Sequence, residues 1–178
     1  MWKQVTPLAI VSFPSRVLIL VVVAVSAEPE GVRAQVAFPP AAQIIIGQAG
    51  VVDGDTIEIH GTRIRLHGID APESGQTCEA LGERYRCGQR AAIALDGFLG
   101  SQTVKSVQTD TDRWKRIVAR CFIRGNDLGK WMVENGWAIA FRRYSTEYVE
   151  SEARARDNKL GMWKGEFMPP EEWRRGGR

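Results

Sequence analysis

The middle of the chain alternates between apolar and polar positions in short runs, a pattern typical of β-strands. Residues 44–52 are apolar and β-branched but are interrupted by two glycines, which predicts a bent first strand. Residues 56–60 and 62–69 alternate on either side of a His-Gly pair, which predicts a tight hairpin. Two further alternating runs, 102–110 and 116–125, predict another pair of strands.

The predicted hairpin determines which side chains lie opposite each other. A two-residue turn at its tip places Ile57 opposite Ile64 and Glu58 opposite Arg63. Glu58 and Arg63 are therefore interpreted as a cross-strand ion pair in solvent rather than as catalytic residues.

Helical patterns are interleaved with the later strands. Apolar residues in 87–100 recur at helical spacing and the run stops at a glycine, which predicts a first helix. The segment 127–136 begins with Asp127, a favourable N-cap, and ends at a glycine, which predicts a second helix. Residues 145–161 have the length and composition of a third helix. This order of elements predicts an α+β domain built around a small barrel.

The first residues have the features of a secretory signal peptide. Lys3 and Arg16 precede a short apolar run, 17–27, that ends in small residues suited to a cleavage site. The run is too short to span a bilayer, so a signal peptide is preferred over a membrane anchor. Cleavage is expected after Ala27 or, as a second choice, after Ala34.

These features divide the chain into four segments. They are a signal peptide, a flexible leader, a globular domain and an arginine-rich tail, at residues 1–27, 28–42, 43–165 and 166–178. A chain of 178 residues that is 44% hydrophobic and 25% charged suits one core with short appendages. The protein is expected to be secreted or periplasmic, with no stable membrane association after signal cleavage.

The net charge alone does not point to a nucleic-acid partner. The formal charge of +3 falls by two when Lys3 and Arg16 leave with the signal peptide, which leaves +1. Proteins that bind nucleic acid through a global positive field are far more basic. Any such partner must therefore be recognised through local sites.

Charged residues gather around the predicted hairpin. Because burying charges is costly, a strand pair that only had to fold would not collect them near its ends. Four such residues stand there: Asp55, Arg65, Asp70 and Glu73. Strict alternation puts Asp55 and Arg65 on opposite faces, so the chain must twist or bend for them to meet, with Gly68 as the candidate position.

Four motifs follow one another along the chain. They begin at Val51, Arg63, Asp112 and Asn135 and read VVDGDTIEI, RIRLHGIDAPE, DRWKRIVA and NGWAIA. Together they resemble the staphylococcal nuclease, or thermonuclease, family, from about Ile44 to Trp163. The resemblance implies a five-stranded oligonucleotide-binding (OB) barrel with three helices and a calcium-dependent phosphodiesterase site on its surface.

The resemblance also implies roles for individual residues. The implied metal ligands are the carboxylates of Asp55 and Asp70 and the backbone carbonyl of Ala71. The implied catalytic residues are Glu73 as the base and Arg65 and Arg116 as phosphate ligands. Carboxylate and carbonyl oxygens suit a hard cation such as Ca²⁺, and a neighbouring glutamate can position or deprotonate the attacking water. Planar, permanently charged guanidinium groups suit the phosphate.

The sequence departs from the family pattern beside the second arginine. Trp114 and Lys115 stand where the family has Tyr and Gly, so Lys115 is strained if that position requires a positive φ. Trp114 is expected to contact substrate, as are Phe141 and Tyr144, which loosely match the family's two substrate-stacking tyrosines.

Three cysteines in an exported chain make one pair and leave one over. Cys78 and Cys87 flank a polar loop, and a disulfide can close it in an oxidising compartment. Cys121 lies in an apolar alternating run and is expected to be a buried thiol. Neither histidine has partners at zinc-ligand spacing, so zinc is not expected.

The combined prediction is a monomeric, exported nuclease that cuts DNA and RNA with little sequence preference and uses Ca²⁺. Base stacking and backbone contacts tolerate any base. One alternative is an OB-fold module that binds single-stranded nucleic acid without cutting it, but the retained acidic and arginine residues argue against it. Another is an envelope-tethered adaptor that binds protein, which predicts an uncleaved N-terminus and no metal dependence.

Overall fold

The computed structural model of the chain describes residues 42–176. The chain divides after residue 38 into two units, and the described residues belong to the second. The predicted signal peptide, both cleavage positions and all but the last residue of the leader lie outside the described residues. Among residues 42–176, no helix is both long enough and apolar enough to cross a membrane.

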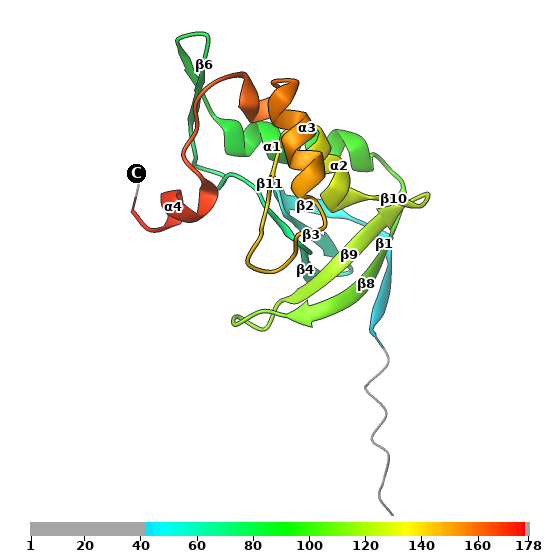
Figure 1. Ribbon diagram of the computed structural model, residues 1–178. Helices are drawn as coiled ribbons and strands as arrows, with labels where there is room; N and C mark the ends of the chain where they lie inside the picture. Colours follow the sequence, from blue (N-terminus) through cyan, green and yellow to red (C-terminus); the bar gives the residue numbers. More distant parts are fainter. Residues whose placement is uncertain (1–41, 177–178) are drawn as a thin grey trace, which may run out of the picture. The chain divides into compact units, whose positions relative to one another are not determined.

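Most strands of the described chain belong to one curled sheet. Its strands are β1 (Ile44–Gln48), β2 (Gly50–Asp53), β3 (Thr56–Ile59), β4 (Thr62–Leu66), β8 (Thr103–Thr111), β9 (Ile117–Ile123) and β10 (Asn126–Asp127). Their order is β1-β8-β9-β4-β3-β2, with β10 beside β9. Because β1 and β2 are consecutive in the chain, the predicted bent first strand reaches both edges and the sheet curls round on itself (Figure 1).

The α+β class and the OB-type barrel are confirmed, with β1 and β2 as the two halves of one bent strand. The β3–β4 hairpin also has the predicted register: Ile57 lies opposite Ile64, and Glu58 lies opposite Arg63. The Arg63 Nε atom is 3.6 Å from Oε2 of Glu58, and both side chains are exposed. This pair is therefore the solvent-exposed ion pair that the hairpin pattern predicts.

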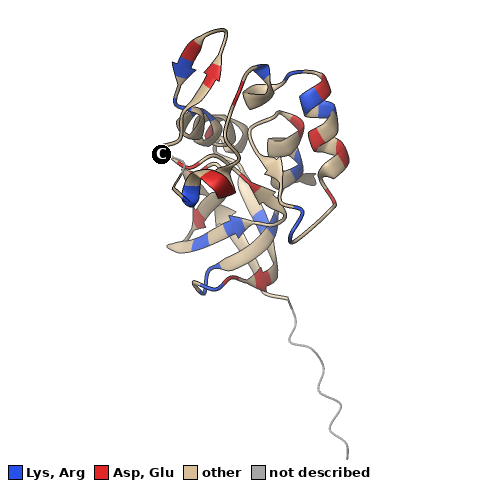
Figure 2. Ribbon diagram, turned by 60° about the vertical axis from the view of Figure 1, so that its left-hand side comes forward, with Lys and Arg blue, Asp and Glu red and all other residues tan. Residues whose placement is uncertain are grey.

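Helices cover one end of the curled sheet (Figure 1). They are α1 (Cys87–Leu99), α2 (Leu128–Glu134), α3 (Val149–Asp157), the 3₁₀ turn η1 (Gly161–Lys164) and α4 (Pro170–Arg174). Asp127 caps α2 as predicted, because its Oδ1 accepts a hydrogen bond from the Lys130 amide at 3.0 Å. Acidic and basic residues are interspersed over the helices and the sheet (Figure 2).

Two predictions about the helices need correction. The third helix begins at Val149 and not at Ser145. The Ser145 hydroxyl accepts from the Glu147 amide at 3.1 Å and so holds a turn before the helix. The arginine-rich tail includes a short helix, α4, that sequence periodicity does not reveal because it has only five residues.

One apolar core joins the barrel to the helices. Its fully buried large side chains include Ile57, Ile59, Ile64, Leu66, Leu95, Leu99, Leu128 and Met132. Each buried aliphatic side chain of this size contributes roughly 1.5–3 kcal/mol through removal from water. The core therefore fixes α1 and α2 against the strands that carry the charged residues.

A small hairpin stands apart from the main sheet. Strands β6 (Cys78–Ala80) and β7 (Glu83–Tyr85) pair with each other, and a disulfide joins Cys78 to Cys87 at the start of α1. Cys121 is free and buried in β9, opposite Ser106 of β8, and its thiol donates to the Ser106 hydroxyl oxygen at 3.2 Å. Burial raises the pKa of the Cys121 thiol to about 12.

The chain turns sharply between β4 and β5 (Ile69–Asp70), at the predicted position. Gly68 has a φ of +72°, and a β-carbon there would lie 3.1 Å from the Tyr148 ring. A glycine is therefore favoured both by the backbone and by the space available. Strand β5 then pairs with β11 (Ile139–Ala140), which places Asp70 opposite Ile139.

Candidate active site

Two buried carboxylates form the centre of the candidate site. Asp55 lies in the turn between β2 and β3, and Asp70 is the last residue of β5. Their side chains are 6% and 0% exposed, respectively. Asp55 is fixed from its own turn, since its amide donates to Oδ1 of Asp53 at 3.0 Å. Asp53 is therefore a turn residue, as its Asp-Gly context indicates.

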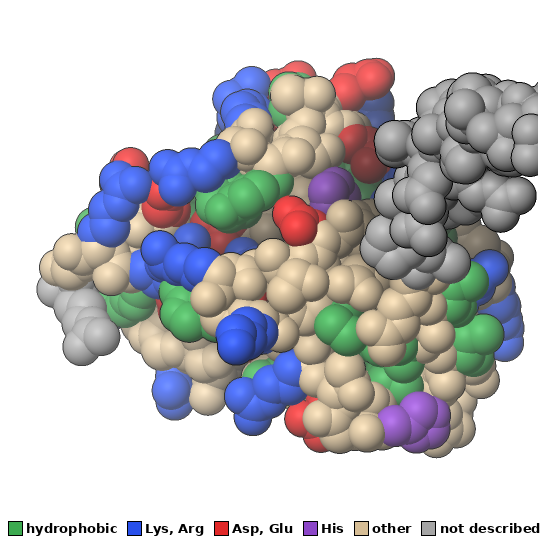
Figure 3. Space-filling model, turned by 90° about the horizontal axis from the view of Figure 1, so that it is seen from below, with side chains coloured by type: hydrophobic (Ala, Val, Ile, Leu, Met, Phe, Trp, Pro, Cys, Tyr) green, Lys and Arg blue, Asp and Glu red, His purple; other side chains and the backbone are tan. Residues whose placement is uncertain are grey.

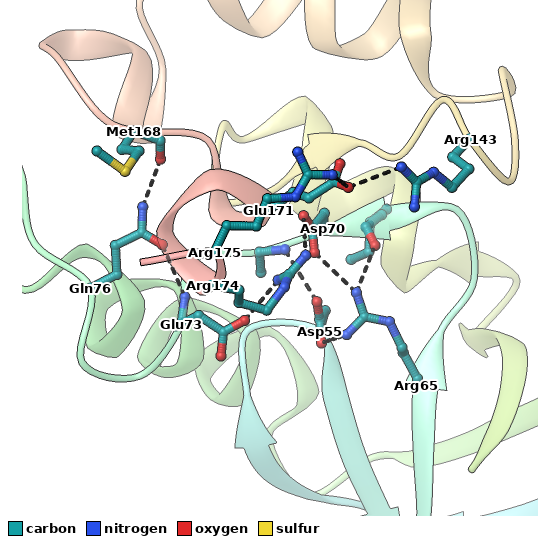
Figure 4. Close-up of polar contacts among 12 residues, drawn as sticks. Asp55, Arg65, Asp70, Glu73, Gln76, Arg143, Met168, Glu171, Arg174 and Arg175 are labelled. Atoms are coloured by element: carbon teal, nitrogen blue, oxygen red, sulfur yellow. Dashed lines mark hydrogen bonds and ion pairs between the residues drawn. The ribbon is translucent and has the colours of Figure 1, made fainter. Parts of the chain in front are cut away.

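Arg65 joins the two carboxylates. Its Nη1 is 2.8 Å from Oδ1 of Asp55, and its Nη2 is 3.1 Å from Oδ1 of Asp70 (Figure 4). Strict strand alternation would separate Asp55 from Arg65, but Asp55 lies in the turn and outside the alternating strand. The turn at Gly68 then brings Asp70 back to the same guanidinium group. The expected bend at Gly68 is thus present, and the turn before β3 brings Asp55 to the same guanidinium group.

Burial and neighbouring charge act in opposite directions on Asp55. Burial raises its pKa to about 7, while the positive charge of Arg65 opposes the rise and the carboxylates of Asp53 and Asp70 add to it. An Asp55 carboxylate in this position gains from any additional positive charge. The pair therefore favours a cation nearby.

Ala71 follows Asp70 directly and contacts the same group. Its amide donates to Oδ2 of Asp55 at 3.2 Å, and the residue is buried. The backbone of Ala71 is thereby held beside both carboxylates. This is the position in which its carbonyl group would serve as the ligand that the family resemblance implies.

Glu73 lies at the edge of this cluster, with 41% of its side chain exposed. Its loop is fixed by buried Gln76, whose side-chain oxygen accepts from the Glu73 amide at 3.2 Å. Gln76 in turn donates to the carbonyl oxygen of Met168 at 2.7 Å. Helix α1 packs so closely here that a β-carbon on Gly88 would overlap the Glu73 carbonyl oxygen.

A second arginine, Arg174 of α4, binds the same carboxylates. Its Nη2 is 2.9 Å from Oδ2 of Asp70, and its Nη1 is 2.7 Å from Oε1 of Glu73 (Figure 4). Sequence analysis missed this residue because it lies beyond the resembling region and 104 positions after Asp70. The arginine-rich composition of the tail was the one available signal.

Arg116 is positioned differently from Arg65. Within residues 42–176, its guanidinium group pairs with Asp112, at 2.7 Å from Nε to Oδ2, and not with Asp55, Asp70 or Glu73. Both residues belong to the turn between β8 and β9.

The turn before Arg116 has the conformation that the family's glycine would favour. Lys115 has a φ of +64°, a region that L-residues adopt at a cost of roughly 1–2 kcal/mol. Asp112 supports the turn, because its Oδ1 accepts hydrogen bonds from the backbone amides of Trp114 and Arg116, both at 2.9 Å. The strain expected at Lys115 is thus present, and the turn forms despite it.

Aromatic side chains lie in two loop segments, the turn before Arg116 and the residues that follow β11. Trp114 is 62% exposed, and the Arg113 guanidinium lies 3.9 Å from its ring centre. Phe141 and Tyr144 follow β11 and contact each other edge to face, with 4.9 Å between their ring centres. The face turned downward in Figure 1 carries Lys and Arg side chains next to hydrophobic ones (Figure 3). Such interleaving suits the backbone and bases of nucleic acid.

The donor chemistry fits a hard cation. Within the described residues, no group of three or more His, Cys, Asp or Glu side chains converges to hold a metal unaided. A cation bound by Asp55 and Asp70 would therefore complete its shell with the Ala71 carbonyl and water, as calcium commonly does. Among the described residues of this cluster there is no cysteine or methionine sulfur to act as a soft ligand, which disfavours copper and zinc.

The fold and this cluster define an OB-type barrel with acidic and arginine side chains at the edge of its sheet. Residues 63–165 match the family model described as staphylococcal nuclease homologue. A succinoglycan biosynthesis protein, ExoI, of Rhizobium meliloti is 41% identical over 130 residues, which cover 71% of this chain and 68% of the relative. The chain belongs to the staphylococcal nuclease family.

Two further relatives carry nuclease names. A micrococcal nuclease of Shigella flexneri is 32% identical over 143 residues, which cover 70% of this chain and 77% of the relative. An uncharacterized endonuclease of Haemophilus influenzae is 26% identical over 133 residues, which cover 70% of each chain. These similarities support a nuclease that acts on nucleic acid.

Proposed function

We propose that the protein is an exported, calcium-dependent nuclease that hydrolyses phosphodiester bonds in both DNA and RNA. The observation that carries the proposal is the buried Asp55–Asp70 pair, joined by Arg65 and flanked by Glu73. A site of this kind combines ligands for a hard cation with a carboxylate that is accessible to water.

Each side chain has a distinct role in this proposal. Asp55 and Asp70 would hold the cation, which when bound neutralises charge on the phosphate. Glu73 is 41% exposed, so its carboxylate can hold a water molecule for attack and accept a proton from it.

Arg65 would stabilise the phosphate. Its contacts with Asp55, Asp70 and the Ile69 carbonyl use three of its five N–H donors, which leaves donors for phosphate oxygens. Because Asp55 and Asp70 fix the guanidinium plane, little reorganisation is needed when charge develops on the phosphate.

A cleavage assay with metal control tests this function. The purified domain should degrade DNA and RNA when calcium is present and should stop when a calcium chelator is added, with activity restored by excess calcium. Asp70→Asn should be inactive at any calcium concentration, because it removes a ligand charge. Full cleavage in thoroughly chelated buffer would contradict calcium dependence, and binding of single strands without cleavage would favour the non-catalytic alternative.

Export is a separate part of the proposal and rests on the residues before Glu28. Intact mass measurement on the protein recovered outside the cytoplasm should give a chain that begins at Glu28 or at Gln35. An intact N-terminus on an envelope-bound protein would instead support a tethered adaptor.

A further inference from the structure

The acidic cluster already holds a positive group supplied by the end of the chain. Arg174 bridges Asp70 and Glu73 with hydrogen bonds of 2.9 and 2.7 Å. These are the carboxylates to which the proposed function assigns the cation and the attacking water. Arg174 therefore occupies the side of Asp70 that faces Glu73 (Figure 4).

Each carboxylate oxygen of the buried pair already accepts a hydrogen bond. Oδ1 and Oδ2 of Asp55 accept from Arg65 and from the Ala71 amide, and Oδ1 of Asp70 also accepts from Arg65. The remaining atom, Oδ2 of Asp70, accepts from Arg174. A cation bound to an oxygen of Asp70 would therefore lie close to the positive charge of Arg65 or of Arg174.

Of the two, Arg174 is easier to displace. Arg65 lies on β4 within the main sheet, and its side chain is 17% exposed. Arg174 lies at the end of a five-residue helix, and its side chain is 35% exposed. Moving Arg65 would also break its ion pair with Asp55, whereas moving Arg174 leaves that pair intact.

Another contact of α4 links it to residues 141–144, which include the two aromatic residues expected to contact substrate after β11. Glu171 of α4 forms an ion pair with Arg143, with 3.1 Å between Oε1 and Nη2. Arg143 lies between Phe141 and Tyr144 in the sequence. Pro170 is buried, so the start of the helix is fixed more firmly than its end. Helix α4 thus touches both the acidic cluster and the segment whose aromatic residues are expected to contact substrate.

We propose that Arg174 is an internal counter-ion that competes with the catalytic cation, so that cation binding and release of the α4 end are coupled. Two positive groups cannot share the Asp70 carboxylate without repulsion. Reciprocity then requires that displacement of Arg174 raises cation affinity by the same factor by which the cation loosens α4. This inference rests on the proposed calcium site.

Calcium titration by calorimetry tests the inference on the binding step. Arg174→Gln should bind calcium roughly tenfold more tightly than the unaltered protein, within the usual range of coupling between two sites. Arg175→Gln is the matched control, because it removes the same charge one residue later from a side chain that pairs only with Glu171 among the described residues. Its calcium affinity should change much less. Equal affinities of Arg174→Gln and the unaltered protein, or weaker binding by Arg174→Gln, would overturn the inference.

Hydrogen exchange on the unaltered protein gives a second readout that needs no variant. The amides of Trp173 and Arg175 donate to Pro169 and Glu172 carbonyl oxygens at 3.0 Å, so a docked helix protects them. Calcium should accelerate their exchange, while α1 amides stay protected. Unchanged or slower exchange in α4 with calcium bound would contradict release.

The two proposals fail in different ways. If all variants bind calcium with the same affinity and cleave nucleic acid, only the counter-ion role of Arg174 is wrong. If no variant binds calcium and cleavage resists chelation, the proposed calcium site fails and the counter-ion role fails with it.

Discussion

The backbone of Gly88 lies so close to the carbonyl group of Glu73 that only glycine fits at position 88. A β-carbon at Gly88 would overlap the carbonyl oxygen of Glu73, which lies on the loop between β5 and β6. Helix α1 therefore supports the backbone of the proposed base directly.

Gly88→Ala should displace the Glu73 loop and lower both stability and turnover. We expect a loss of at least about 1–3 kcal/mol in the free energy of unfolding, as for overpacked sites. Gly97→Ala is the matched control, because position 97 lies in the same helix with no neighbouring atom in reach of a β-carbon. It should stabilise the protein by roughly 0.5–1 kcal/mol. Urea unfolding and steady-state cleavage measure both effects, and equal behaviour of the two variants would contradict the contact.

Glu73→Gln and Arg65→Lys should separate catalysis from binding. Both should lower kcat by roughly two orders of magnitude, as for lost general-base or charge-stabilising contacts. Substrate affinity should hold in Glu73→Gln, because removal of a negative charge cannot weaken attraction to a phosphate. Steady-state cleavage of a short labelled oligonucleotide gives both quantities. A large rise in KM with unchanged kcat for Glu73→Gln would exclude its role as the base.

Arg116 should matter for turnover although its guanidinium group pairs with Asp112. Arg116→Ala is expected to reduce kcat by roughly two orders of magnitude if its guanidinium turns from Asp112 to the phosphate. Lys115→Gly should keep the turn, because φ is already positive, and should change the free energy of unfolding by less than about 1 kcal/mol. If Arg116→Ala cleaves normally while Arg65→Lys does not, Arg113 or Lys115 becomes the candidate second phosphate ligand.

The disulfide should stabilise the protein without taking part in catalysis. Cys78→Ser with Cys87→Ser opens a loop with a sequence separation of 9, which is expected to cost about 2–3 kcal/mol. Non-reducing peptide mapping should link these two cysteines and leave Cys121 as a thiol. Because its pKa is raised to about 12, Cys121 should resist alkylation at pH 8 until the protein unfolds. A bridge from Cys121 to either partner would refute this pairing.

Local patterns predicted the parts of the fold that local interactions determine. The β3–β4 register follows from alternation and one turn, and the start of α2 follows from the cap at Asp127. The meeting of Asp55, Arg65 and Asp70 was predictable only through the family resemblance, since it depends on the turn before β3 and the turn after β4.

Contacts between distant segments could not be predicted in this way. The pairing of Arg174 with Asp70 joins positions 104 apart, and no periodicity connects them. The residues of the β6–β7 hairpin have the sequence pattern of a polar loop, because each strand has only three residues. The sequence predicts a start for α3 that is too early, because the turn held by Ser145 resembles the beginning of a helix.

The bent first strand has a consequence for the order of events during folding. β2 can pair with β3 across a short stretch of chain, but β1 pairs with β8, so that Ile44 must wait for Val107. Closing such a long loop slows folding and leaves the β1 edge open in the meantime. The hairpin that carries Arg65 can therefore form early, whereas the closed barrel, and with it any cutting of nucleic acid, must await most of the chain.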